Sequence, residues 1–198
     1  QALLSGATTA VVSNLYSKLL KRDDDMNIVK DLVTDYSIVD DTTWTFTLRE
    51  DAKFHNGDPV TSADVKFSIE RAAKDDTLME YPHWKNVESV DIIDDYHFNI
   101  KTWEPYPALE ALLSKSGGDI LPKNYIEEVG MDAFIKAPIG SGPYKFVSYT
   151  KDQEVVMEPN LDYYDTVNTT WDKVVFRVLP ESSTRVGELL AGGVDIVN

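Results

Sequence analysis

The chain has 198 residues, 42% of them hydrophobic, and 34 acidic residues against 19 basic ones give it a formal net charge of −15. The length and apolar content suffice for a buried core in one or two domains, and the charge disfavours nucleic acid and anionic membranes as partners. The chain has no cysteine, which excludes disulfides, thiolate metal sites and cysteine nucleophiles.

Both ends of the sequence lead us to expect a fragment of a longer protein. The chain starts at Gln1 without an initiator Met or a visible signal peptide, and it stops at Asn198 directly after an expected strand. No apolar run approaches the length of a membrane span.

The first fifty residues predict a helix, an acidic turn and a strand. Apolar residues recur at helical spacing through residues 11–20, behind Thr8 or Thr9 as the N-cap. Residues 21–25 (KRDDD) predict a solvated turn that ends this helix. Residues 42–49 alternate Trp, Phe and Leu with Thr and Arg, which is typical of a half-buried strand.

A turn and a capped helix are predicted soon after this strand. Asn56 and Gly57 form a strong turn pair, because Gly accepts a positive φ and Asn tolerates it, and Pro59 follows. Thr61 and Asp64 have the spacing of a capping box, in which the hydroxyl and the carboxylate satisfy free amides of the new helix. Local structure explains each of these five residues, and we interpret them as scaffold rather than as a site.

The helix after this cap has an apolar stripe formed by Val65, Ile69 and Ala72. Phe67 lies off that stripe. We therefore expect a second side of the helix to be covered as well.

The rest of the chain predicts strands and short helices. In chain order, the sequence first favours strands at residues 87–93 and 96–100 and helices at 107–113 and from Pro122 to about Phe134. A hairpin of residues 140–149 with 153–159 follows. The chain then favours a strand at 173–180, a Ser-capped helix at 182–193 that Gly192 ends, and a strand at 194–197. The last three elements are typical of a βαβ unit. We therefore expect residues 174–179 and 194–197 to be parallel neighbours in one sheet.

The motifs that could carry chemistry fail on their spacing. His55, His83 and His97 have no metal-site spacing, and the acidic stretch from Asp23 lacks the Gly and the Glu that a calcium loop requires. Residues 140–145 (GSGPYK) cannot form a dinucleotide loop, because Pro and Lys stand where the helix start and the third Gly are needed. The sequence therefore predicts no catalytic residue, no metal and no cofactor.

Four blocks along the chain resemble, in order, those of the family 5 extracellular solute-binding proteins, the oligopeptide, dipeptide and nickel receptors of ABC importers. The blocks are residues 44–73, residues 137–146 (APIGSGPYKF), residues 158–164 (EPNLDYY) and residues 176–197, which contain Gly-x-Val-Asp. Ser141 and Tyr164 depart from the family pattern, which has Thr and Trp at these positions.

The resemblance implies a periplasmic binding protein type II-like fold of the mixed α/β (α+β) class, with a ligand enclosed between two lobes. This chain is expected to be the first lobe only, with the second lobe absent. Residues 1–41 and 137–198 would form the core of that lobe, and residues 42–136 would be an inserted α+β subdomain.

The resemblance and the loop positions together suggest where a substrate would bind. The expected substrate-binding residues are Ser5, Gly6, Thr8, Trp103, Ser116 and Gly117. The first three precede the expected first helix, and the last two follow the expected short helix, where a flexible connection is an equally open interpretation. Trp103 lies among prolines at a strand end, and such loops line ligand clefts.

The implied function is the capture of extracellular oligopeptides or dipeptides for an ABC importer, with permease subunits as partners and no catalysis. The alternatives are a receptor of the same fold for a nickel chelate, a sugar or an opine-like compound, a sensor or adhesion module, and a hydrolase, for which no motif is present. The whole protein is expected to be exported, and either periplasmic or lipid-anchored on the cell surface.

Overall fold

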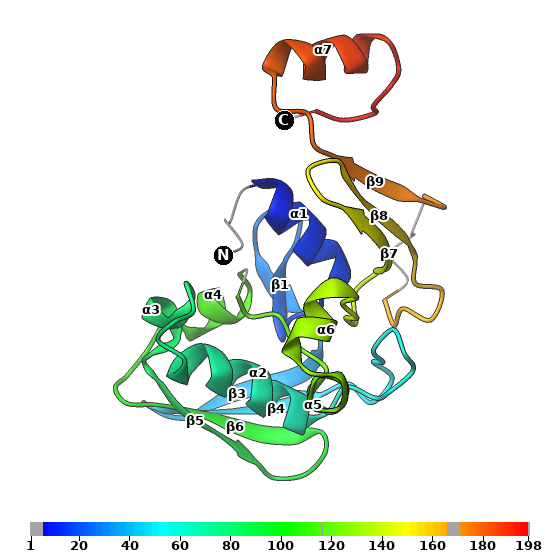
Figure 1. Ribbon diagram of the computed structural model, residues 1–198. Coiled ribbons are helices and arrows are strands. Elements are labelled where there is room, and N and C mark those ends of the chain that lie inside the picture. The colour runs from blue at the N-terminus through cyan, green and yellow to red at the C-terminus, as the bar shows by residue number, and fades with distance from the viewer. Residues whose placement is uncertain (1–5, 116, 166–170, 198) are drawn as a thin grey trace.

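The computed structural model describes residues 6–115, 117–165 and 171–197, and these form three antiparallel sheets with helices around them (Figure 1). The sheets have two, four and three strands. None of the described helices is long and apolar enough to cross a membrane.

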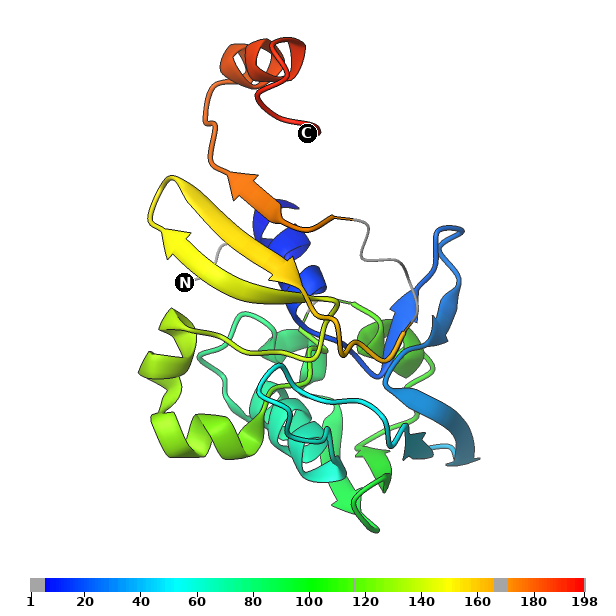
Figure 2. The same ribbon diagram turned by 90° about the vertical axis from the view of Figure 1, so that its right-hand side faces the viewer.

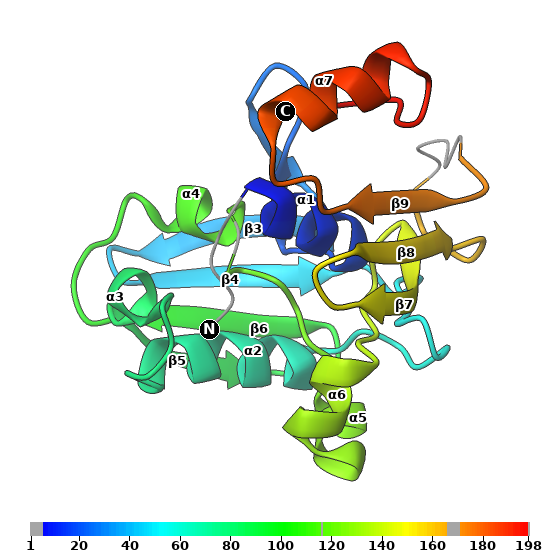
Figure 3. The same cartoon turned by 45° about the horizontal axis from the view of Figure 1, so that its top comes forward.

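A four-stranded sheet carries the main core. Its strands, in spatial order, are β3 (Val33–Asp40), β4 (Thr43–Leu48), β6 (His97–Thr102) and β5 (Val87–Ile92). Side chains alternate along β4 as predicted, with Trp44, Phe46 and Leu48 buried. The helix α2 (Ser62–Lys74) lies across one face of this sheet, as Figures 1 and 3 show from two directions.

The predicted turn and capping box before α2 are confirmed. Gly57 has a φ of +94°, a conformation that residues with a Cβ rarely adopt. The Asp64 carboxylate accepts the Thr61 backbone N–H at 2.9 Å and the Thr61 hydroxyl at 2.8 Å. The apolar stripe is buried as predicted, with Val65 and Ile69 facing the core.

The strands predicted at residues 87–93 and 96–100 are confirmed as β5 and β6, which are antiparallel neighbours. The Asp94 carboxylate closes the turn by accepting backbone N–H groups of Tyr96 and His97 at 2.9 and 2.8 Å. Two short helices are also present: α3 (Tyr81–Trp84) contacts α2, and α4 (Leu109–Leu113) contacts the strand β1 (Leu20–Arg22).

The first helix, α1 (Gly6–Leu15), is shorter than predicted. It does not continue because the Lys18 backbone N–H donates to the Asp31 carboxylate at 3.0 Å instead of to the preceding turn. Thr8 and Thr9 lie inside α1, so neither is its N-cap.

The first hairpin of the chain follows α1 and is formed by β1 (Leu20–Arg22) and β2 (Ile28–Lys30). The Asp23 carboxylate accepts backbone N–H groups of Asp25 and Asn27 at 3.0 and 2.8 Å, which closes the turn. The predicted solvated acidic turn is therefore confirmed.

The helix predicted from Pro122 to about Phe134 is split into α5 (Lys123–Val129) and α6 (Met131–Lys136). Gly130, between them, has a φ of +82°, which a continuous right-handed helix cannot contain. Pro122 was predicted to be the first helical residue, but it is the N-cap of α5, and the helix begins one position later at Lys123.

The third sheet confirms the predicted hairpin and the strand after it. It consists of β7 (Tyr144–Thr150), β8 (Glu154–Pro159) and β9 (Val174–Arg177) in that order. A second apolar cluster with Leu15, Tyr144 and Met157 joins this sheet to α1, which lies beside it in Figure 2.

The predicted βαβ unit is wrong for the described residues. The helix α7 (Ser182–Leu190) forms, and Gly192 with a φ of +72° follows its end as predicted, but residues 194–197 form no strand. The β9 strand pairs antiparallel with β8, and a strand at 194–197 has no partner ladder among the described residues. No side chain of α7 is buried, and the helix lies outside the third sheet, past the end of β9 (Figures 1 and 2).

The predicted Ser cap of α7 is also wrong. Glu181 is the N-cap residue and makes no side-chain capping bond. Arg185 instead bonds the backbone before the helix, since its guanidinium donates to the carbonyl oxygens of Leu179 and Pro180 at 2.8 and 2.9 Å.

Candidate functional site

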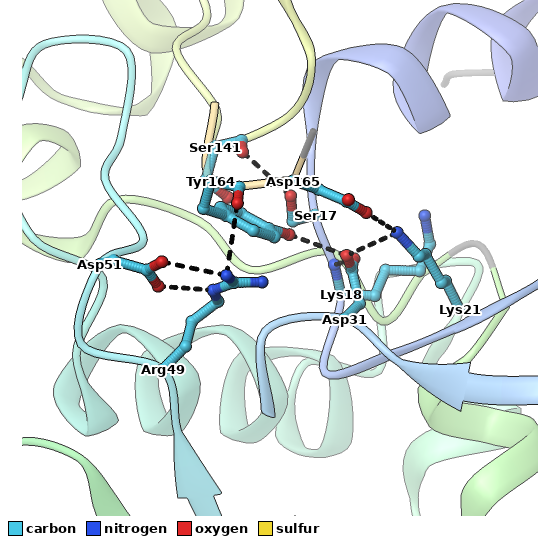
Figure 4. Close-up of polar contacts among 9 residues, drawn as sticks. All are labelled: Ser17, Lys18, Lys21, Asp31, Arg49, Asp51, Ser141, Tyr164 and Asp165. Atoms are coloured by element: carbon cyan, nitrogen blue, oxygen red, sulfur yellow. Dashed lines mark hydrogen bonds and ion pairs between the residues drawn. The ribbon is translucent and has the colours of Figure 1, made fainter. Parts of the chain in front are cut away.

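Polar side chains from separate parts of the chain converge at a site that we call the polar junction. Its residues are Ser17, Lys18, Lys21, Asp31, Arg49, Asp51, Ser141, Tyr164 and Asp165 (Figure 4). They come from the loop after α1, the first hairpin, the segment after β4, the loop before β7 and the loop after β8. The junction therefore connects residues 17–51 with the loops that contain residues 141 and 164–165.

Asp31 is at the centre of the polar junction and is buried. Its carboxylate accepts the Lys18 backbone N–H at 3.0 Å and the Tyr164 hydroxyl at 2.8 Å (Figure 4). The Lys21 ammonium lies 3.5 Å from the same carboxylate and 2.7 Å from Asp165. The buried charge of Asp31 is thus compensated by two hydrogen bonds and one cation.

These contacts shift the pKa values of two groups. Burial, reinforced by the charge of Asp31, raises the pKa of the Tyr164 hydroxyl, so this group remains a hydrogen-bond donor. Burial acts to lower the pKa of Lys21, but the hydrogen bond to Asp165 and the charge of Asp31 outweigh it and raise this pKa. Both groups are therefore fixed in the protonated state.

Arg49 closes the other side of the polar junction. Its guanidinium binds Asp51 in a bidentate pair at 2.6 and 3.0 Å and lies 3.9 Å from the centre of the Tyr164 ring (Figure 4). The hydrogen bond to Asp51 raises the pKa of Arg49. Arg49 thus remains a cation and holds the Tyr164 ring against the segment after β4.

The loop before β7 fits against the end of α1 without spare space. The Ser17 hydroxyl donates to the Ser141 carbonyl oxygen at 2.9 Å, and the Gly142 backbone N–H donates to the Leu15 carbonyl at 3.0 Å. A Cβ at Gly140 would lie 2.0 Å from that Leu15 oxygen, so glycine is required for this close approach.

His55 fixes the same loop from the opposite side. Its Nδ1 accepts the Gly140 backbone N–H at 3.1 Å, and its Nε2 lies 3.0 Å from the Gly142 carbonyl oxygen. This pairing requires the neutral ring with the proton on Nε2. Burial lowers the pKa of His55 to about 4, which favours that neutral form.

The chemistry of the polar junction is that of a structural connection. The contacts within the junction pair its acids with cations, backbone amides or a tyrosine hydroxyl, and they aim no nucleophile at a base. Within residues 6–115, 117–165 and 171–197, no cluster of His, Asp or Glu could hold a metal ion.

The expected binding residues at the start of the chain do not form a loop before α1. Ser5 lies outside the described residues. Gly6 and Thr8 belong to the first turn of α1, because that helix begins two residues or more before the expected start. Whether they contact a substrate stays a prediction.

Trp103 and Gly117 lie near the two ends of α3. Trp103 follows β6, is 65% exposed, and donates its backbone N–H to the Asn86 carbonyl at 3.0 Å. Gly117 has a φ of +93° and packs against the Glu80 side chain, 2.5 Å from where a Cβ would lie. Ser116 lies outside the described residues. The structure thus brings these two expected contacts to one region of the surface.

The sequence did not indicate the polar junction. Asp31 and Tyr164 are 133 positions apart, and neither lies in a motif with a chemical signature. The one available signal was that Tyr164 falls in the third block of the family resemblance, where the pattern has Trp.

The model of the bacterial extracellular solute-binding proteins, family 5 Middle, matches residues 27–198. The chain belongs to this family. It is 27% identical over 185 residues to the glutathione-binding protein GsiB of Salmonella typhi, an alignment that covers 92% of the chain and 36% of GsiB. It is 30% identical over 176 residues to the periplasmic oligopeptide-binding protein OppA of Haemophilus influenzae, covering 79% of the chain and 32% of OppA.

A solved structure of the same family confirms the fold. The crystal structure of NikZ from Campylobacter jejuni in complex with Ni(L-His) superposes with a TM-score of 0.84 and 32% identity, over 93% of this chain and 37% of NikZ. The expected mixed fold of the type II periplasmic binding proteins is therefore confirmed. The chain spans about a third of the length of these relatives.

Proposed function

We propose that this family 5 chain is part of one lobe of a receptor that captures peptides outside the cell membrane for an ABC importer. The observation that carries the proposal is the superposition of nearly the whole chain on a solved ligand-binding receptor of the family. The oligopeptide- and glutathione-binding names of the two relatives favour a peptide. Such receptors enclose a ligand, and backbone hydrogen bonds supply much of the affinity.

In this proposal the polar junction makes the lobe rigid. A receptor that closes on its ligand by hinge motion needs lobes that move as units. The bonds from Asp31 and Arg49 to Tyr164 connect the first hairpin and the segment after β4 to the third sheet. We therefore assign the junction to positioning and expect no covalent chemistry by this protein.

The division of the lobe at residues 41/42 and 136/137 stays a prediction. The loop of residues 140–142 returns to the end of α1, which supports a core made from both ends of the chain. The strand β3, however, pairs with β4, so residues 33–40 share a sheet with the proposed subdomain.

A nickel chelate is a second candidate ligand. The observation that favours it is the NikZ structure, which was solved with Ni(L-His) and is 32% identical to this chain. Among the described residues, no group of three or more His, Asp or Glu side chains could hold a metal ion.

The whole protein tests the proposal. We expect the protein to be periplasmic or lipid-anchored on the cell surface, with permease subunits as its partners. Native mass spectrometry of the protein purified from the extracellular or periplasmic fraction should show a bound peptide. Titration with short peptides and with Ni²⁺ plus L-histidine then separates the two candidates. Turnover of the peptide, or no binding of either ligand, would contradict a peptide or chelate receptor.

A further inference from the structure

We propose that a groove on the outer side of α2 binds an acidic peptide segment of a partner protein, anchored in the groove by an apolar side chain. The groove has a volume of about 510 Å³ and lies between α2, the end of β5 and the start of α5. It is separate from the polar junction and from the surface at α3. The inference does not depend on which solute the receptor captures.

Phe67, which lies off the apolar stripe of α2, forms part of the floor of the groove. Val65 and Ile69 face the sheet, whereas Phe67 points to the other side and does not belong to the main core cluster. It is half-buried, and Ile92 beside it is 45% exposed. These two side chains offer an apolar surface that a partner's apolar side chain would cover.

The rim of the groove is basic. Four of the chain's 19 basic residues border it, namely Lys66, Arg71, Lys74 and Lys123, against Glu70 and Asp75. Glu127, outside the groove, pairs with Lys123 at 2.7 Å, so Lys123 adds no net charge to the rim. The Glu70 carboxylate lies 3.0 Å from the Lys66 ammonium and 2.7 Å from the Lys74 ammonium, so this trio keeps a net positive charge. Lys66 is also fixed in place, because it donates to the Val90 carbonyl at 2.7 Å.

This local charge selects the partner. The whole chain carries a net charge of −15, so a positive rim is complementary to acidic groups that the rest of the surface repels. The shape of the site separates a peptide from an anionic membrane, because a side chain of an extended segment can enter the groove and a flat bilayer cannot. The occupant is therefore an acidic segment with one apolar residue, and not a lipid surface.

The test uses the whole protein and a defined probe. The probe is the peptide Glu-Glu-Leu-Phe-Glu-Glu-amide with fluorescein coupled to its N-terminal amine, followed by fluorescence anisotropy at 20 and 300 mM NaCl. Its blocked ends remove the charged termini that a peptide receptor recognises in its cleft. We expect binding that weakens at the higher salt concentration and that loses at least tenfold in affinity in the Arg71→Glu/Lys74→Glu variant.

A matched control variant makes the same charge change elsewhere. Lys151 and Lys173 are exposed and lie at the ends of the third sheet, so Lys151→Glu/Lys173→Glu should change the affinity less than twofold. Phe67→Ser should weaken binding as well, and circular dichroism verifies that each variant is folded. A probe with Lys in place of Glu should not bind the groove.

Four results would overturn the inference. Equal affinity in the two double variants, or equal binding of the Lys peptide, would show that the rim does not select the ligand. Binding to anionic vesicles that the Arg71→Glu/Lys74→Glu variant loses would make the occupant a membrane. A dimer in the absence of probe that the same variant loses would make the occupant a second copy of this protein.

Discussion

The side chain of His55 and the backbone of Gly142, 87 positions apart, are joined by a hydrogen bond of 3.0 Å. His55 belongs to the turn before α2, and Gly142 belongs to the loop before β7 that packs on the end of α1. The second ring nitrogen accepts the Gly140 backbone N–H, so one neutral imidazole holds both ends of this loop. Since a protonated imidazole has no acceptor, the contact makes the fold sensitive to acid.

The first prediction is a loss of stability as the pH falls from 6.5 to 4. Burial lowers the pKa of His55 from 6.5 to about 4, so the unfolded chain takes up a proton in this range while the folded chain does not. The contribution is fully present above pH 6.5 and is lost on acidification, by about 3 kcal/mol. Urea unfolding of the chain at several pH values measures it.

The control for this prediction is His55→Gln, which cannot titrate but can still accept and donate hydrogen bonds. Between pH 7 and pH 4 the free energy of unfolding should fall by about 3 kcal/mol more in the wild type than in the variant. Parallel pH profiles would show that His55 is not held in its neutral form.

The second prediction concerns the Tyr164 hydroxyl, which donates to the buried Asp31 carboxylate at 2.8 Å. Tyr164→Phe should lower the free energy of unfolding by about 2 kcal/mol, because a buried charged acceptor loses a donor. Tyr149 is 59% exposed, and Tyr149→Phe should change stability by less than about 0.5 kcal/mol. Equal effects of the two variants in thermal or urea unfolding would rule out a central role for Asp31.

The third prediction compares two glycines. A Cβ at Gly140 would lie 2.0 Å from the Leu15 carbonyl oxygen, whereas a Cβ at Gly187 in α7 would meet no atom within 4 Å. Gly140→Ala should therefore destabilise the chain by about 3 kcal/mol through forced displacement of the loop. Gly187→Ala should be neutral or stabilise α7 by up to about 1 kcal/mol. Denaturant midpoints of both variants test the pair, and a tolerated Gly140→Ala would mean that the loop can move away from α1.

The fourth prediction concerns the cap of α2. Thr61→Ala removes the hydroxyl that bonds Asp64 and should cost about 1 kcal/mol of stability. Thr61→Ser keeps the hydroxyl and should restore most of this loss. Ligand binding by the whole protein should not change in either variant. A large loss of affinity at an unchanged melting temperature would show that Thr61 belongs to a binding site.

Local signals in the sequence predicted the parts of the fold that depend on neighbouring residues. The turn at Gly57, the cap at Thr61 and the alternation along β4 each need only a few adjacent positions, and all three are confirmed. The helix break at Gly130 was missed because glycine in a helical pattern does not by itself reveal a positive φ.

Features that depend on distant residues could not be predicted in this way. The early end of α1 results from the bond between Lys18 and Asp31, and the polar junction results from contacts over more than a hundred positions. The strand expected at residues 194–197 failed for the related reason that a strand requires a partner, which local sequence does not supply. Order of motifs, rather than local pattern, identified the family.

The measurement that tests the central claim most directly is the affinity of this chain alone for the ligand of the whole protein. The solute that co-purifies with the whole protein is titrated by calorimetry into the whole protein and into the 198-residue chain, whose folding is checked by circular dichroism. If one lobe supplies about half of the roughly 8 kcal/mol of a micromolar receptor, the chain alone should bind with a dissociation constant near millimolar. We predict micromolar or tighter binding by the whole protein and binding weaker by about a thousandfold by the chain. A dissociation constant near micromolar for the chain alone would place the complete site inside this lobe and would contradict capture between two lobes.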